Sequence, residues 1–170
     1  MRAPLAEFVR AVTRLSGVGA ALGAVLIAAI TVVVFYEVVA RYVFAAPTEW
    51  SMELTSYALV WCGFFGAAYT LRRGRHVRVD LLLERLPVSA QRTLELFVDL
   101  VGLGFSVLVT YQGARFVYQS YITESTSVSP LRVPLFIPEL AVPVGAALLA
   151  LQFLARLLVR AGLAPAEDQP

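Results

Sequence analysis

The segment Arg72-Arg73-Gly74-Arg75-His76-Val77-Arg78-Val79-Asp80 is the most basic stretch of the chain. Two long apolar segments precede it and two follow it. Loops that carry an excess of arginine beside membrane-spanning helices stay on the cytoplasmic side of the membrane. The segment therefore predicts a cytoplasmic loop in the middle of a membrane protein, and it gives every other segment an orientation.

The composition also favours a membrane protein. Of the 170 residues, 59% are apolar and the mean hydropathy is +0.74, whereas soluble domains contain roughly 45–50% apolar residues. The single cysteine, Cys62, and the single histidine, His76, exclude an intrachain disulfide, a bis-histidine haem and a multi-histidine metal site. The chain is therefore not expected to perform redox or zinc chemistry alone, and we expect no cofactor and no bound metal. We also expect no enzymatic activity and no nucleic-acid partner.

Four segments are long and apolar enough to cross a hydrocarbon core of about 30 Å as helices. A secretory signal is the rival interpretation of the first. We expect a retained span, because the run is longer than an h-region and charged residues follow it where a cleavage site would lie. We predict an all-α integral membrane protein with a single domain over 1–170, a brief amphipathic helix within 1–15, a short interfacial helix within 80–86 and a mobile tail at 164–170. The predicted spans are 16–40, 51–71, 90–119 and 134–158.

The distribution of arginine predicts that both termini are cytoplasmic. With four alternating spans, eleven of the 14 arginines fall on the side of the termini and the central loop, and three fall on the opposite side. The opposite side is acidic and aromatic, which suits a docking face. Its carboxylates are Glu37, Glu49, Glu53, Glu124 and Glu139.

Candidate partner contacts lie around the first predicted junction. Glu37 and Arg41 are four residues apart, so they share a helix face and can form an ion pair. Gly19 and Gly23 form a small-xxx-small pair that would let another helix approach closely, although glycine is common in membrane helices without such a role. The sequence does not identify the helix that faces the partner, and the glycine face of the first span is our candidate.

The start of the second span supplies further candidates. Thr48 is a plausible N-cap, and acidic residues follow it in the first turns, where they complement the helix dipole. Trp50, Ser51 and Glu53 either contact a partner or serve as helix caps and interfacial anchors.

Two carboxylates, Glu95 and Asp99, lie one turn apart in the third span. A charge within the membrane costs about 2.5–3.5 kcal/mol on insertion scales, so both need an explanation. They could hold a coupling ion or a proton. Alternatively, they lie near the cytoplasmic interface and pair with arginines, for which we name Arg72, Arg73 and Arg92.

The central loop has simpler roles. Its arginines fix the topology, although they could also bind a partner. His76 is a pH-sensitive group by its ordinary chemistry, or it bonds within the loop to Asp80 or contacts lipid headgroups. The loop residues concerned are Arg72, Arg73, Arg75, His76, Arg78 and Asp80.

Several short motifs occur in one order along the chain. Glu37-x-x-x-Arg41-Tyr42-Val43-Phe44 is followed by Pro47-x-x-Trp50-Ser51-x-Glu53-Leu54, then by Trp61 with Gly66-Ala67-Ala68, and then by the basic segment at 72–80. The late Pro138-x-x-x-x-Pro143-x-Gly145 motif completes the series. In this order and spacing the chain resembles the small membrane subunit of tripartite ATP-independent periplasmic (TRAP) transporters, the DctQ-like family.

The resemblance implies a function. Such subunits lie in the bacterial inner membrane beside a large permease that carries the sodium and substrate sites, and a periplasmic solute-binding protein delivers the substrate, often an organic acid. The small subunit is expected to act as a fixed scaffold that also contacts membrane lipids.

Two other classes of function stay open from the sequence. An autonomous four-helix transporter working as a homodimer would need an embedded charge facing a cavity, and Asp99 is its candidate. A membrane-bound enzyme or electron-transfer anchor would need a ligand pair or a nucleophile with a base, and one histidine and one cysteine do not supply either.

Overall fold

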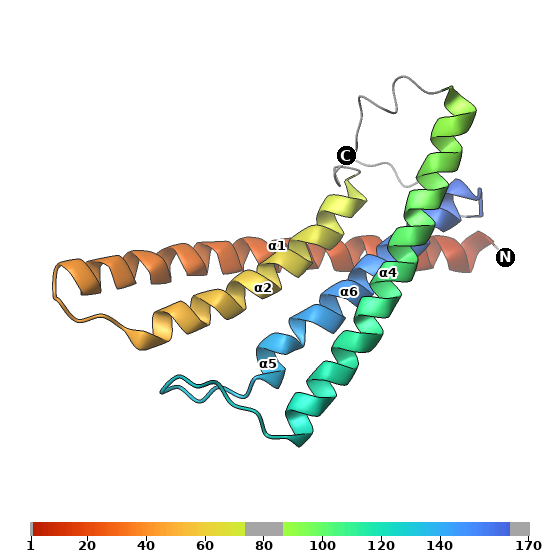
Figure 1. Cartoon of the computed structure of the whole chain (residues 1–170). Helices are drawn as coiled ribbons and strands as arrows, with labels where there is room; N and C mark the ends of the chain where they lie inside the picture. Colours follow the sequence, from red (N-terminus) through yellow and green to blue (C-terminus); the bar gives the residue numbers. More distant parts are fainter. Residues whose placement is uncertain (1, 74–86, 164–170) are drawn as a thin grey trace.

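The computed structural model describes residues 2–73 and 87–163 (Figure 1). Its elements are α1 (Arg2–Tyr42), α2 (Glu49–Arg72), α4 (Val88–Ile122), α5 (Phe136–Glu139) and α6 (Ala141–Arg160). Over these described ranges there is no β-strand, and the extended contacts amount to an isolated bridge between Thr126 and Pro134. The predicted all-α class is confirmed.

Within residues 2–73 and 87–163, four helical segments are long and apolar enough to cross a membrane, as the sequence predicted. They are Leu5–Tyr42, Glu49–Arg72, Ala90–Ile122 and Phe136–Arg160. The fourth is interrupted at Leu140, where α5 ends and α6 begins, and Pro143 lies in the first turn of α6. Proline lacks the amide donor that a helix interior requires, and the first turn is the place where that loss matters least.

The first helix differs from the prediction at its start. We expected a separate amphipathic helix within 1–15, but α1 is continuous over 41 residues. At 1.5 Å per residue it is about 60 Å long, roughly twice the hydrocarbon thickness. The N-terminal part of α1 therefore has a partner of its own: Val9 and Val12 pack with Ala155 of α6 in a buried cluster.

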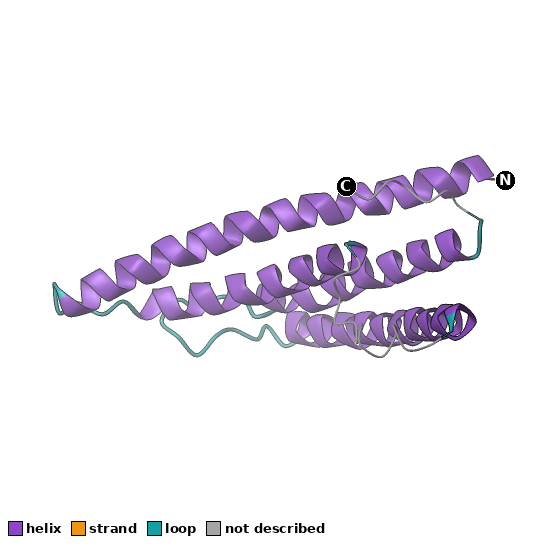
Figure 2. Ribbon diagram, turned by 90° about the horizontal axis from the view of Figure 1, so that it is seen from above, coloured by secondary structure: helices purple, strands orange, loops and turns teal. Residues whose placement is uncertain are grey.

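The helices pack around α6. Helices α1 and α2 form an antiparallel hairpin, α4 packs along α6, and α6 also contacts α2 and α1. Figure 1 shows α4 crossing α6 at the face away from α1, and Figure 2 shows α1 alone on one side of the molecule. Because α6 pairs with α4 and also contacts the α1–α2 hairpin, it sets the position of α4 relative to that hairpin.

Close approach within this arrangement depends on two glycines. A Cβ placed on Gly145 of α6 would lie 2.2 Å from the Cβ of Phe64 on α2. A Cβ placed on Gly102 of α4 would lie 2.4 Å from Cζ of Phe153 on α6. Each aromatic side chain thus lies directly against glycine backbone, which is how membrane helices gain contact area in the absence of a hydrophobic driving force.

Most large apolar side chains of α1 and α4 face outward. Val32 and Phe35 on α1 are 68% and 71% exposed, and Phe105 on α4 is 67% exposed. A water-soluble monomer rarely exposes apolar surface on this scale. The outward faces are those of helices surrounded by lipid or by other membrane chains.

One smaller prediction can be compared with a helix end. Thr48 lies at the N-cap position of α2 as expected, but it forms no capping hydrogen bond. Helix α4 begins at Val88 after Pro87. The interfacial helix predicted within 80–86 and the tail at 164–170 lie outside the described residues, and the orientation in the membrane remains a prediction.

Candidate functional site

The carboxylate of Glu37 joins the end of α1 to the start of α2. Its Oε1 accepts hydrogen bonds from Nε and Nη2 of Arg41 at 3.1 and 2.7 Å, so the predicted ion pair is present. Its Oε2 accepts from the backbone amide of Thr48 at 3.1 Å and from the Ser51 hydroxyl at 2.9 Å. The Thr48 hydroxyl also donates to Oε2, which explains why it does not cap α2. We call Glu37, Arg41, Thr48 and Ser51 the Glu37 cluster.

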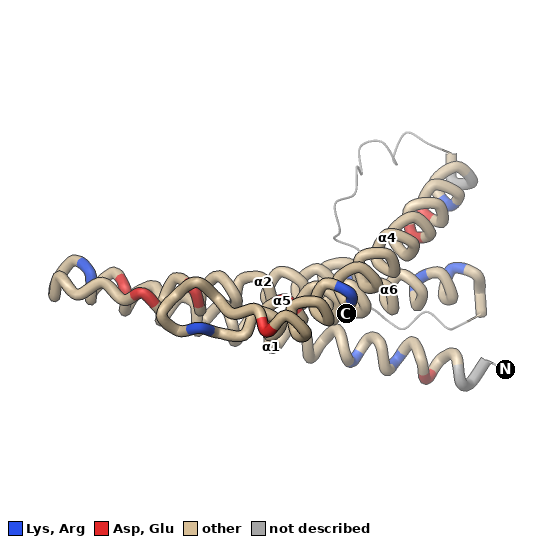
Figure 3. The backbone as a smooth tube through the Cα atoms, turned by 60° about the horizontal axis from the view of Figure 1, so that its bottom comes forward, with Lys and Arg blue, Asp and Glu red and all other residues tan. Residues whose placement is uncertain are grey.

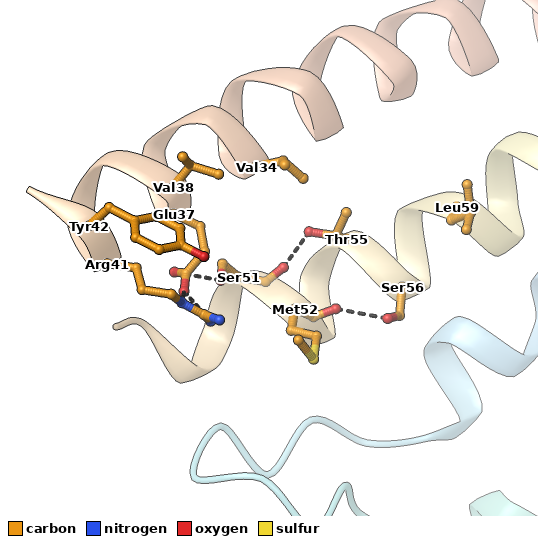
Figure 4. A pocket seen from close by; sticks show the side chains of 10 residues that line it. All are labelled: Val34, Glu37, Val38, Arg41, Tyr42, Ser51, Met52, Thr55, Ser56 and Leu59. Atoms are coloured by element: carbon orange, nitrogen blue, oxygen red, sulfur yellow. Dashed lines mark hydrogen bonds and ion pairs between the residues drawn. The ribbon is translucent and has the colours of Figure 1, made fainter. Parts of the chain in front are cut away.

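A groove of about 370 Å³ opens beside the Glu37 cluster, between α1 and α2 (Figure 4). At the connecting-loop end it is polar, and deeper along the helices it becomes apolar. The hydroxyls of Thr55 and Ser56 in its wall donate to backbone carbonyls one turn earlier. Neither hydroxyl proton is therefore available to a molecule that enters the groove. The lining residues are Val34, Glu37, Val38, Arg41, Tyr42, Ser51, Met52, Thr55, Ser56 and Leu59.

Trp50 and Glu53 face other neighbours. The Trp50 ring lies 6.0 Å from the ring of Tyr36, centroid to centroid, and so anchors α2 to α1. Glu53 turns towards the connection after α4: it accepts a hydrogen bond from Tyr57 at 2.6 Å through Oε1 and one from Ser129 through Oε2. The structure therefore divides the predicted candidates between two clusters.

The connection that Glu53 holds, residues 123–135, is an ordered loop. The Ser127 amide donates to the carbonyl of Val133 at 2.9 Å, the Val133 amide donates back to the Ser127 hydroxyl at 3.1 Å, and the Leu135 amide donates to the Ser125 carbonyl at 3.0 Å. With Ser129 bound to Glu53, the loop is held against α2. This contact joins the two helical hairpins at the acidic end of the molecule.

Asp99 and Glu95 pair with α6. Oδ2 of Asp99 lies 2.9 Å from Nη1 of Arg160, and Oδ1 lies 3.6 Å from Nη2 of Arg156. Glu95 lies 3.2 Å from Nη2 of Arg160. These carboxylates thus have arginine neighbours, as one interpretation expected, but Arg156 and Arg160 are partners that we did not name.

Gly19 and Gly23 permit a close approach, but to α2 of the same chain. A Cβ on Gly19 would lie 3.5 Å from the Phe65 ring, and one on Gly23 would lie 3.8 Å from the Phe65 Cβ. Both glycines are buried by this contact. Within this chain, α2 therefore lies against the glycine face, and a contact of Gly19 and Gly23 with another subunit stays a prediction.

Part of the basic segment is described. Nη1 of Arg72 donates to the carbonyl of Thr13 on α1 at 3.3 Å, and the Arg73 guanidinium lies 5.1 Å from the centroid of the Tyr69 ring. Arg75, His76, Arg78 and Asp80 lie outside the described residues.

One polar contact was not foreseen. Gln152 of α6 is buried, and its Nε2 donates two hydrogen bonds to α1. One goes to the Ser16 hydroxyl, and the other goes to the carbonyl of Val12 at 3.3 Å. Polar side chains within spans commonly hydrogen-bond across helices. An amide in the apolar run of the fourth span was the signal that could have predicted this contact.

The arrangement is one of paired charges between helices. In the part of the chain that the structure describes, no three histidine, cysteine or carboxylate side chains gather as metal ligands. Glu37, Glu53, Glu95 and Asp99 each have at least one partner on a neighbouring helix or loop, which suits a role in holding helices together.

Comparison with known families assigns the chain. The family model described as "Tripartite ATP-independent periplasmic transporters, DctQ component" matches residues 30–162. The chain belongs to the DctQ family. The match contains every candidate residue named above except Gly19 and Gly23, which precede it. Membership and the four helices of spanning length make the chain a multi-pass protein of the bacterial inner membrane.

Individual relatives agree with this family. The chain is 38% identical over 109 residues to the C4-dicarboxylate TRAP transporter small permease protein DctQ of Rhodobacter capsulatus. The aligned residues make up 62% of the chain and 46% of that relative. It is 28% identical over 148 residues to the protein of the same description from Vibrio cholerae. The aligned residues make up 74% of the chain and 63% of that relative. The matches thus span about half to two thirds of these two relatives.

A third relative is longer. The isethionate TRAP transporter permease protein DctMQ of Oleidesulfovibrio alaskensis is 26% identical over 146 residues, which make up 82% of the chain but 23% of that protein. A region similar to about four fifths of this DctQ-family chain is therefore part of a much larger polypeptide in that bacterium.

Proposed function

We propose that this DctQ-family chain is the small scaffold subunit of a sodium-coupled TRAP-type secondary transporter. It pairs with a large permease that holds the substrate and ion sites, and a periplasmic solute-binding protein delivers an organic acid or a related solute. The chain itself performs no catalysis and carries no substrate alone.

The long DctMQ relative supports the pairing. The region similar to this chain makes up 23% of that permease protein. A region that is joined covalently to a larger permease in one bacterium is expected to bind a separate large permease where the two are distinct chains. This observation carries the proposal.

The described charges favour a scaffold over a carrier. Asp99, the residue that an autonomous transporter would need, is buried between α4 and α6 with Arg160 at 2.9 Å. A carboxylate neutralised by fixed arginines is poorly suited to bind and release a cation, because each release would leave the arginines buried without a counter-charge. The same pair suits a rigid helix contact.

The groove beside the Glu37 cluster is the surface that we assign to the large permease. It is lined by three of the predicted partner residues, Glu37, Arg41 and Ser51. Arg41 is 46% exposed there, and its two hydrogen bonds to Glu37 use Nε and Nη2, so Nη1 has no bond within the described residues. A helix with a small polar group at this depth and apolar side chains below it would match the lining.

Co-purification in mild detergent tests the proposal. The tagged chain is extracted from its native membrane and its companions are identified by mass. Recovery of one large polytopic permease in equal amounts, together with sodium-dependent uptake by the reconstituted pair plus binding protein, is the expected result. Recovery of the chain alone, active in liposomes as a homodimer, would overturn it.

A further inference from the structure

Four arginines come together where α1 and α2 meet at the end of the molecule that holds the N-terminus. Arg10 and Arg14 are exposed on α1, Arg73 is exposed at the end of α2, and Arg72 is half-buried beside it. Figure 3 shows basic positions on this part of α1 and acidic positions at the far end of the α1–α2 hairpin. The transporter assignment does not use this cluster.

The helix geometry brings the four side chains to one face. Arg72 reaches α1 over Thr13, and its Nη1 would lie 3.6 Å from a Cβ on Gly17. Residues 10, 14 and 17 follow the i, i+4, i+7 spacing, which is one face of a helix. Arg10 and Arg14 therefore lie on the side of α1 next to the point that Arg72 covers. Arg73 follows Arg72 at the end of α2, where its guanidinium lies 5.1 Å from the centroid of the Tyr69 ring.

The four arginines also lie at one depth. The uncharged run of α1 begins at Leu15, directly after Arg14, and is long enough to fill the hydrocarbon core. Arg10 is about 6 Å further along the helix, and the headgroup layer on each side of the core is roughly 5–8 Å thick. The hydrogen bond from Arg72 to Thr13 places the end of α2 at the same level. If the uncharged run of α1 fills the hydrocarbon core, these four residues fall at the level of the headgroup layer.

Counter-charges are scarce in this cluster. The arginines of α6 at the same end are occupied, since Arg156 and Arg160 lie 3.6 and 2.9 Å from the Asp99 carboxylate. In contrast, none of the four cluster arginines forms an ion pair within the described residues, and Glu7 is the one carboxylate on the adjoining turns of α1. The cluster thus carries an excess of positive charge that no described protein group offsets.

An apolar surface continues from the arginines into the membrane. Val18 lies one turn below Arg14 on the same face of α1 and is 57% exposed. Leu22 and Val25 continue this face and are exposed as well. A molecule with an anionic head and long hydrocarbon chains would contact the guanidinium groups and this apolar surface together.

We infer that Arg10, Arg14, Arg72 and Arg73 form a binding site for the headgroup of an anionic phospholipid. The guanidinium groups donate hydrogen bonds to the phosphate oxygens, and the acyl chains lie along Val18 and the exposed residues below it. Guanidinium binds phosphate well because its planar donors match two oxygens at once. Basic clusters at this level of a membrane protein are known to select anionic headgroups.

Native mass spectrometry of the purified full chain with added lipid tests the site. The probes are phosphatidylglycerol and phosphatidylcholine, which share a phosphate and acyl chains but differ in net charge. The wild-type chain is expected to retain phosphatidylglycerol in preference to phosphatidylcholine. Arg10→Gln with Arg14→Gln should weaken phosphatidylglycerol binding roughly 25-fold, from about fivefold per arginine near an anionic surface.

The matched control removes two arginines at the opposite end. Arg115 and Arg132 are exposed there, so Arg115→Gln with Arg132→Gln makes the same change in net charge away from the site. Equal binding of the two lipids by the wild-type chain would overturn the inference, and so would an equal loss in the control variant. The comparison of the two lipids on the wild-type chain needs no variant, so it still tests the site if Arg10→Gln with Arg14→Gln prevents correct insertion into the membrane.

Discussion

Nη1 of Arg160 lies 2.9 Å from Oδ2 of Asp99, across the contact between α6 and α4. The Asp99 side chain is 2% exposed, and Arg156 approaches its other oxygen at 3.6 Å. The arginines of α6 offset the negative charge of this buried carboxylate. The carboxylate in turn offsets their positive charge, so they can lie within the helix contact. The pair therefore determines how α4 and α6 meet.

Replacing Asp99 by Asn should destabilise the chain strongly. The substitution keeps the shape of the side chain and leaves two arginines near a buried neutral group, and breaking a buried pair by removing one partner costs about 3–5 kcal/mol. Thermal unfolding in detergent micelles measures this as a lower melting temperature.

Glu95→Gln is the matched control for that substitution. The Glu95 side chain is 32% exposed, and Arg160 keeps Asp99 as a partner when Glu95 is changed. The expected cost is below about 1 kcal/mol, as for partly exposed pairs. Full stability of Asp99→Asn combined with loss of transport by the isolated chain would favour the autonomous transporter instead.

The glycine contact between the same two helices gives a second prediction. A Cβ on Gly102 would lie 2.4 Å from Cζ of Phe153. Gly102→Ala therefore forces the ring or the helix to move, and overpacking of this kind costs about 1–3 kcal/mol. The same unfolding measurement should show the loss.

Gly104 supplies the control, because nothing lies within 4 Å of a Cβ placed there. Gly104→Ala should leave the melting temperature unchanged or raise it slightly, since alanine favours a helix over glycine. Gly102→Ala combined with Phe153→Leu should recover most of the stability. Equal effects at Gly102 and Gly104 would show that close packing is not the cause.

The features that sequence could predict are those carried by neighbouring residues. Four apolar runs predicted four helices, and the four-residue spacing predicted the Glu37–Arg41 ion pair. Thr48 was placed correctly at the N-cap, since local sequence decides where a helix begins. Each of these predictions needs no knowledge of how the helices pack.

The features that sequence missed depend on packing between distant segments. Glu53 and Ser129 are 76 residues apart, and Gln152 and Ser16 are 136 apart. The arginines opposite Asp99 are on α6, which only the crossing of α4 and α6 brings near. For Gly19 the motif predicted a close approach but not the contact with Phe65 of α2, because a small residue does not identify the helix that approaches.

A third prediction concerns the surface assigned to the large permease. Val38 and Leu59 line the groove beside the Glu37 cluster and are 47% and 64% exposed. Val38→Trp and Leu59→Trp should fill the groove, so a partner helix could no longer enter it. The large permease should then be lost from mild-detergent co-purification while the chain itself stays folded.

Val107→Trp on α4 is the control for the groove variants. Val107 is 53% exposed and lies outside the groove, so the same gain in volume occurs on another outward face. Co-purification should be unchanged. Loss of the permease with Val107→Trp but not with the groove variants would assign the contact to α4.

The last prediction concerns the connection between α1 and α2. Glu37→Gln keeps the size of the side chain but removes the charge and half of its accepting capacity, while Arg41, Thr48 and Ser51 all donate to it. Hydrogen bonds to a charged acceptor are the stronger kind, so the connection should open more often. Hydrogen exchange of the peptide over 43–51, which contains the Thr48 amide, should become several-fold faster.

Glu49→Gln changes an exposed neighbouring carboxylate and should leave that exchange as it is. Unchanged exchange in Glu37→Gln would mean that backbone contacts alone hold the hairpin closed.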